Sequence, residues 1–104
     1  MGWIVGRGGT INVSNTLYNT SQDPTLPSKI DLYNATIRTK NLENRANGEI
    51  YLKDQGKIES AIFTSTKDSK FYFIGSGSGF GSISGAQSIT LDGEEFFQAG
   101  LLNT

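Results

Sequence analysis

Short runs of branched and aromatic residues that alternate with polar ones recur along the whole chain. They occupy residues 3–5, 10–13, 49–53, 57–63, 70–74, 88–91 and 94–98, and Ile30, Leu32 and Ile37 add one or two more. Alternation with a period of two is typical of β-strands that bury one face, and a chain of this length forms one domain. Helical spacing is confined to residues 40–46, which support a turn at best. The pattern predicts a single all-β domain over residues 1–104 with about eight short strands.

The connections between these runs have the length and composition of hairpin loops. Residues 54–56 would join 50–53 to 57–63, residues 67–69 would join 61–66 to 70–74, and Asp92-Gly93 would join 88–91 to 94–98. Asp-Gly tolerates the positive φ angles of a tight hairpin turn. Residues 23–27 contain two prolines and predict a loop. Adjacent hairpins predict an antiparallel sheet that closes as a β-sandwich, a jelly roll or a small barrel.

Two pairs of similar short segments within the chain leave a short β-solenoid open as an alternative fold. Gly48-Glu49-Ile50 resembles Gly56-Lys57-Ile58 at a spacing of eight, and the segment 17–21 resembles 32–36 at a spacing of fifteen. A solenoid keeps one period over several repeats, whereas these two spacings disagree. The antiparallel domain is therefore the main prediction.

The composition excludes several classes of protein. The chain has no Cys and no His, so it can form neither disulfides nor thiolate or imidazole sites for catalysis or metal binding. Its formal net charge of −1 argues against a nucleic-acid-binding protein, which needs a basic surface. Acidic residues are the remaining candidates for chemistry. Asp92, Glu94 and Glu95 cluster at a predicted turn, where charges are normally solvated, and no calcium-loop motif is present. We therefore expect no enzyme, no metal and no cofactor.

A Gly-Ser tract over residues 75–85 is the most conspicuous local feature. It lacks the third glycine of a dinucleotide-binding loop, the Gly-Lys-Ser/Thr of a P-loop and the spacing of a nucleophile elbow. We expect a long bending loop that Phe80 and Ile83 fix onto the body of the domain.

Apolar residues near both chain ends predict contact with a partner. Residues 1–9 and 99–104 would act as contacting arms, and the interface candidates are Trp3, Ile4, Val5, Phe80, Ile83, Leu101 and Leu102. Chain ends fray unless something holds them, and uncharged apolar ends are unfavourable on a free monomer. Aromatic residues on both faces of the strands allow a second interpretation, in which sugar rings stack on Tyr18, Tyr33, Tyr51 or Tyr72, or on Trp3.

These observations favour a non-enzymatic, self-associating structural protein. In length, in its lack of Cys and in its Gly, Ser, Thr and Asn content it is similar to small virion components of phages, such as capsid decoration (cement) proteins and fibre subunits. The expected partners are further copies of the chain, for example in a trimer, and a larger protein lattice such as a capsid, but neither nucleic acid nor a membrane. No export signal is visible, so we expect synthesis in a cytoplasm and, if phage-encoded, a place in the virion. A carbohydrate-binding module is the alternative.

Overall fold

The structure is a computed structural model that describes residues 2–74, 81–97 and 100–102. Within these ranges the chain forms β-strands and no helix, which confirms the all-β prediction. Every strand pair is parallel, so the antiparallel sandwich, jelly roll or barrel is wrong. The strands are β1 (Trp3–Gly6), β2 (Thr10–Asn12), β3 (Thr16–Asn19), β4 (Ser28–Tyr33), β5 (Thr36–Asn44), β6 (Gly48–Lys53), β7 (Lys57–Ser65), β8 (Lys70–Ile74), β9 (Gly81–Ser84), β10 (Ser88–Leu91), β11 (Glu94–Phe97) and β12 (Gly100–Leu102).

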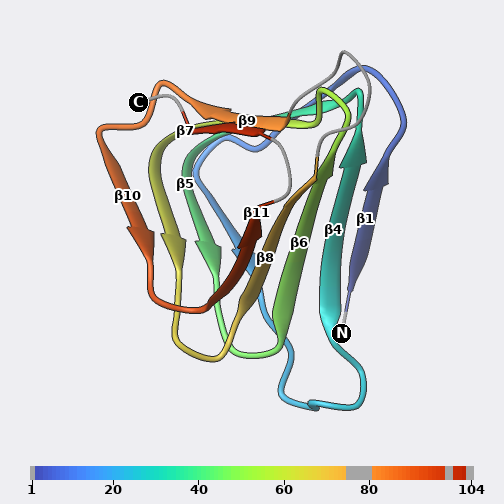
Figure 1. Cartoon of the computed structure of the whole chain (residues 1–104), viewed down its shortest axis with the longest axis vertical. Coiled ribbons are helices and arrows are strands. Elements are labelled where there is room, and N and C mark those ends of the chain that lie inside the picture. The colour runs from blue at the N-terminus through green and yellow to red at the C-terminus, as the bar shows by residue number, and fades with distance from the viewer. Residues whose placement is uncertain (1, 75–80, 98–99, 103–104) are drawn as a thin grey trace.

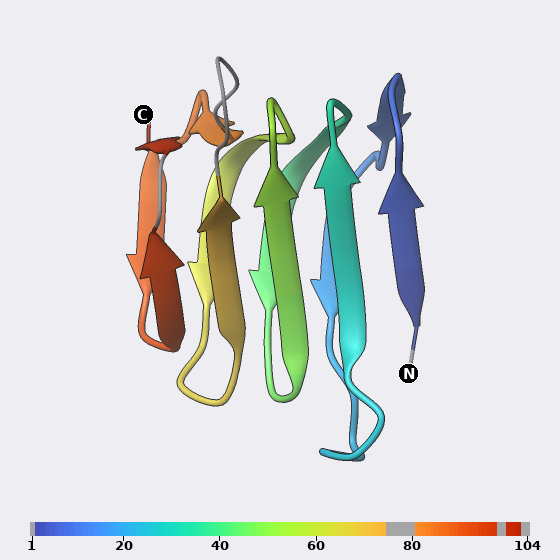
Figure 2. The same ribbon diagram turned by 45° about the vertical axis from the view of Figure 1, so that its right-hand side comes forward.

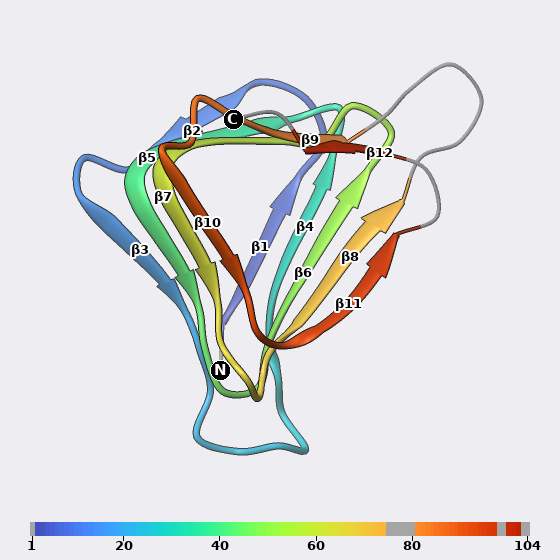
Figure 3. The same ribbon diagram turned by 60° about the vertical axis from the view of Figure 1, so that its left-hand side comes forward.

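The chain winds as a β-solenoid, the alternative that the sequence left open. Successive rungs stack along one axis, and each rung adds strands to the same faces (Figure 1). The five-stranded sheet has the order β1-β4-β6-β8-β11, and it is seen from its outer side in Figure 2. The seven-stranded sheet bends within its two nine-residue strands, so that each of them pairs with two shorter strands. β5 pairs with both β2 and β3, and β7 pairs with both β9 and β10. Viewed along the axis, the outline is a triangle (Figure 3).

Equivalent residues recur every 20 or 21 positions in the middle of the solenoid and mostly every 24 to 26 positions at its two ends. Ile30, Ile50 and Phe71 are register partners in β4, β6 and β8, and they are separated by 20 and 21 residues. The first rung is longer, with 26 residues between Ile4 and Ile30, because it contains the predicted loop at 23–27. The spacings of eight and fifteen instead relate different faces of the solenoid and do not measure its repeat.

The core lies inside the triangle and consists of the inward residues of every second strand position. Leu32, Ile37, Leu42, Ile50, Leu52, Ile58, Phe63, Phe71 and Ile83 are all completely buried. Phe63 and Phe71 meet with ring centroids 5.2 Å apart, which joins the seven-stranded sheet to the five-stranded one. Alternating burial of this kind is what the period-two pattern predicted.

A column of buried polar side chains stabilises the corner between β3, β5 and β7 and the following strands. Asn19 Nδ2 donates to Asn44 Oδ1 at 2.9 Å, and Asn44 Nδ2 donates to Lys70 O at 2.8 Å and to Ser65 Oγ at 3.3 Å. Ser65 Oγ in turn lies 2.6 Å from Ser69 Oγ. Each amide therefore links one rung to the next, as in the asparagine ladders of stacked parallel strands.

The three predicted hairpins are corners of the solenoid. In each case the strands that flank the loop belong to different sheets, so the chain turns onto the next face and does not pair with itself. Positive φ angles occur in one of these three corners, at Asp54 and Gln55, whereas Asp92 and Gly93, for which the sequence predicted them, do not have them. A Cβ atom at Gly93 would lie 2.5 Å from the carbonyl oxygens of Thr66 and Ser69, so a glycine there permits close stacking of rungs. Residues 40–46, expected to form a turn at best, mostly belong to β5.

Candidate functional site

The N-terminal end of the solenoid, formed by β1, β2 and β3, is an open edge. Each of these strands pairs on one side only, β1 with β4, and β2 and β3 with β5. No residue in the three strands is charged. Natural edge strands are usually protected by charges, prolines or a covering segment. This end therefore combines unpaired backbone groups with an uncharged surface.

The inward residues at the N-terminal end are incompletely covered. Ile4, Ile11 and Leu17 occupy the same columns as the core residues of the next rung, and they pack against that core while staying half-buried. Their partners Ile30, Ile37 and Leu42 are 0–1% exposed. One more rung on this side would complete the burial of all three.

Large exposed apolar side chains also gather in this first rung. Among the described residues seven such side chains stand out, and four of them lie between residues 3 and 26: Trp3 at 70%, Val5 at 49%, Tyr18 at 53% and Leu26 at 48% exposure. Exposed apolar groups that cluster in this way mark interaction surfaces, and Trp and Tyr are common anchors in interfaces.

Trp3 forms one side of a shallow pocket at the rim of this end. The pocket has a volume of about 250 Å³ and is lined by Gly2, Trp3, Thr25, Leu26, Pro27 and Lys29. Lys29 Nζ lies 5.8 Å from the centre of the Trp3 ring. The loop is held by Asp23, whose carboxylate accepts hydrogen bonds from the hydroxyl and the backbone N–H of Thr25. These hydrogen bonds lower the pKa of Asp23 below its ordinary value.

The C-terminal end, formed by β10, β11 and β12, also has half-buried apolar residues, Ile89 and Leu91 of β10, but it differs in charge. Glu95 in β11 is the register partner of the buried Phe71, and its neighbours Glu94 and Phe96 are exposed. Strand alternation therefore directs the Glu95 side chain inward. Its Oε1 atom is buried and makes no hydrogen bond within the described part of the chain. A carboxylate thus stands at a core position on this edge.

The four tyrosines predicted to stack on sugars lie in three separate places. Tyr51 and Tyr72 stack on each other outside the five-stranded sheet, with centroids 4.7 Å apart and planes 4° from parallel. Lys53 Nζ lies 5.4 Å from the centre of the Tyr51 ring. Tyr33 lies near Arg7, whose Cζ is 5.8 Å from the ring centre. The four rings do not form one continuous platform.

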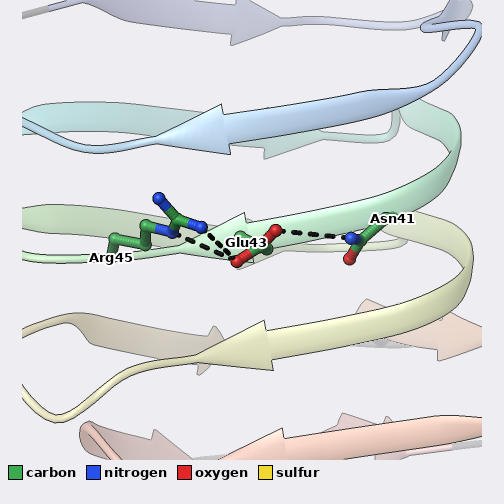
Figure 4. A network of polar contacts seen from close by, with 3 residues as sticks. All are labelled: Asn41, Glu43 and Arg45. Carbon is green, nitrogen blue, oxygen red and sulfur yellow. Dashed lines mark hydrogen bonds and ion pairs between the residues drawn. The ribbon is translucent and has the colours of Figure 1, made fainter.

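Tyr18 belongs to the seven-stranded sheet, next to a polar network. Arg45 Cζ lies 4.6 Å from the centre of the Tyr18 ring, and Arg45 also donates to Glu43 Oε1 at 2.8 and 3.1 Å. Glu43 accepts a further hydrogen bond from Asn41, as Figure 4 shows. Arg45, Glu43 and the Asn41 amide N–H are therefore paired with one another, whereas Asn41 Oδ1 is buried without a hydrogen-bond partner in the described part of the chain.

Of the other predicted interface residues, the structure describes the side chain of Ile83 alone, and it does not join the N-terminal site. Ile83 is completely buried between β7 and β12, so it belongs to the core of this chain. The backbone of Leu101 and Leu102 forms β12, but their side chains and Phe80 lie outside the described residues, as does most of the Gly-Ser tract. Leu26 and Pro27 were missed as site residues, and Glu95 was considered only for catalysis or calcium binding. The two prolines of the loop at 23–27 were the signal for Leu26 and Pro27. The true period of the repeat was the signal that Glu95 stands in the same column as Phe71.

The described residues contain no group of three or more Asp or Glu that could hold a metal ion. No helix long and apolar enough to cross a membrane occurs among them. Comparison with protein-family models, with curated proteins and with solved structures gives no match to this chain.

Proposed function

We propose that this chain is a non-enzymatic structural subunit that self-associates through the N-terminal end of its solenoid. The observation that supports this most strongly is the coincidence of open strand edges with half-buried Ile4, Ile11 and Leu17 at that end. A partner strand laid along β1 would satisfy backbone groups and complete the core in one step.

The virion component suggested by the sequence remains part of this proposal. Both of its forms, a capsid decoration protein and a fibre subunit, need a surface that contacts other subunits, and the open N-terminal end of the solenoid offers one. Many copies would let modest contacts per subunit hold such an assembly together.

Sedimentation velocity over a range of concentrations tests the proposal, and the chain offers a matched pair of variants. Val5 and Phe96 stand in the same outward row of the five-stranded sheet, at opposite ends, and each is 49% exposed. We expect Val5→Lys to abolish self-association and Phe96→Lys to leave it unchanged. A wild-type chain that stays monomeric at every concentration, or equal effects of both variants, would overturn the proposal.

The pocket beside Trp3 favours one second candidate, a carbohydrate-binding module. An exposed indole next to Leu26 and Pro27 offers an apolar floor for a sugar ring, and Lys29 offers a hydrogen-bond donor. Trp3 is the only tryptophan, so its fluorescence reports on the pocket directly. Titration of the monomeric Val5→Lys variant with neutral and acidic oligosaccharides should change the emission. An unchanged spectrum up to millimolar sugar would eliminate this candidate.

A further inference from the structure

The two ends of the solenoid are chemically unlike, and this difference restricts how copies can join. The three edge strands at the N-terminal end carry no charge, whereas the C-terminal end has the inward Glu95 on β11. We propose that the chain forms a closed two-fold dimer in which two N-terminal ends meet, and that Glu95 prevents growth into an open filament. This inference rests on the proposed function and names the partner as a second copy of this chain.

Addition of any strand onto β11 would enclose a carboxylate. Glu95 faces the core beside Phe71, and its Oε1 atom already lacks a hydrogen-bond partner among the described residues. A further strand would remove the remaining water around it, which is strongly unfavourable for an unpaired charge. Inward-pointing charges on edge strands are a known protection against edge-to-edge association.

Head-to-tail stacking would bring Glu95 against the other end of the next copy. If that copy continued the five-stranded sheet in register, Glu95 would stand beside Ile4 and Glu94 beside Trp3. The N-terminal strands offer no charged group to pair with the inward carboxylate. Joining two C-terminal ends would be worse, because Asp92, Glu94 and Glu95 are all acidic and would face their own copies.

Joining two N-terminal ends has neither problem. A two-fold axis perpendicular to the five-stranded sheet sets β1 antiparallel to β1 of the second copy, and places β2 of each copy over β3 of the other. The inward residues then meet across the junction, Ile4 near Ile4 and Ile11 near Leu17. Trp3 and Val5 would lie together on the outer face. Because the same surface is used on both sides, the dimer is closed.

Figure 2 shows where the backbone of the first-rung loop lies relative to this junction. The strands of the five-stranded sheet succeed one another across the view, with β1 outermost at one end and β11 at the other. The loop that contains residues 23–27 hangs below β4, across the direction of stacking. A second copy can therefore approach β1 along the solenoid axis.

Cysteine cross-linking tests the orientation, since the chain has no Cys of its own. In an antiparallel β1–β1 pair, two copies of residue 5 lie opposite or diagonal, with Cβ atoms roughly 5–8 Å apart. We expect Val5→Cys to give a covalent dimer with a short thiol-reactive cross-linker, and Phe96→Cys to give none. If Val5→Cys joins only to Phe96→Cys in a mixture of the two, the copies stack head to tail. That result overturns the two-fold dimer but leaves self-association standing.

Removal of the inward charge tests its role. We expect light scattering to show dimers for the wild type at every concentration above the dissociation constant of the dimer. We expect the same for Glu94→Val, the matched outward change on the same strand. Glu95→Val should give species at least twofold heavier than the dimer. A Glu95→Val protein that folds and stays a dimer, or a wild-type trimer, overturns the inference. If Glu95→Val does not fold, the cross-linking result decides, and a wild type without any association refutes the proposed function itself.

Discussion

The middle rungs and the N-terminal rung place the same kinds of residue in the same columns, but they cover them to different degrees. Ile11, Ile37 and Ile58 are register partners in β2, β5 and β7. Ile37 and Ile58 are completely buried, whereas Ile11 is half-buried. Nothing in the residue type explains this. What differs is the number of neighbouring rungs, because a rung of a solenoid contacts only the rungs next to it.

The same apolar columns that stabilise the middle rungs therefore leave a surface for binding at the end rung. A middle rung buries its apolar surface against its two neighbours, whereas an end rung leaves half of that surface exposed. The column of asparagines behaves in the same way, since Asn44 bonds to both sides and Asn19 to one. Changes at equivalent positions in the middle and at the end measure this difference directly.

The largest effect should come from the isoleucine column. In a Val5→Lys background, which keeps the chain monomeric, we expect Ile37→Ala to lower the free energy of unfolding by about 2–5 kcal/mol. Ile11→Ala should cost about half as much or less, because one side of Ile11 already contacts water. Urea denaturation followed by circular dichroism measures both. Equal losses in the monomer would contradict the comparison.

The asparagine column should show the same ranking with a smaller effect. Asn44→Ala removes the hydrogen bonds to Lys70 O and Ser65 Oγ on one side and the bond from Asn19 Nδ2 on the other, which we expect to cost about 2–3 kcal/mol. Asn19→Ala removes bonds toward one side only and should cost about 1 kcal/mol. The same denaturation experiment applies, with Asn15→Ala in an exposed corner as the control. A larger loss for Asn19→Ala would show that the end of the column matters more than its middle.

Local strand formation was readable from the sequence, and the connection between strands was not. The runs 70–74 and 88–91 coincide with β8 and β10, because alternation depends only on neighbouring residues. Whether two strands then form a hairpin or a solenoid corner depends on the next rung. Gly93 illustrates this, since its need for a small residue comes from Thr66 and Ser69 in an earlier corner.

The period of the solenoid was hidden by substitutions within each column. The five-stranded sheet places Ile4, Ile30, Ile50, Phe71 and Glu95 in one column, so hydrophobic type, aromatic type and finally charge vary along it. The longer first rung also shifts the spacing from 20 or 21 residues to 26. For the candidate site, apolarity near the N-terminus indicated Trp3, Ile4 and Val5 as interface candidates. The inward direction of the Glu95 side chain could be inferred only from the register of β11 with β8.

The outer surface of the middle rungs allows a test by pH. Burial and the hydrogen bond that Tyr51 donates to Glu49, at 2.6 Å, raise the pKa of Tyr51 above its ordinary value of 10. A raised pKa in the folded state stabilises the fold below pH 10, and this stabilisation is lost as the pH rises above 10. We expect Tyr51→Phe to cost about 1 kcal/mol at pH 7 and to flatten the alkaline decline. An unchanged decline in thermal unfolding between pH 9 and 11 would contradict this role.

The smallest effects should come from the ion pairs between middle strands. Arg38 Nε and Glu59 Oε2 lie 2.5 Å apart across β5 and β7, but their side chains are 58% and 37% exposed. Water and salt screen such a pair, so Glu59→Gln should change the free energy of unfolding by about 0.5 kcal/mol or less. Lys53 and Asp31 are 3.0 Å apart with 37% and 18% exposure, and Lys53→Met should cost somewhat more than Glu59→Gln but less than about 1 kcal/mol. Both losses should shrink in high salt. If Glu59→Gln cost as much as Ile37→Ala, charge pairing between strands would rival core burial in holding the middle rungs together.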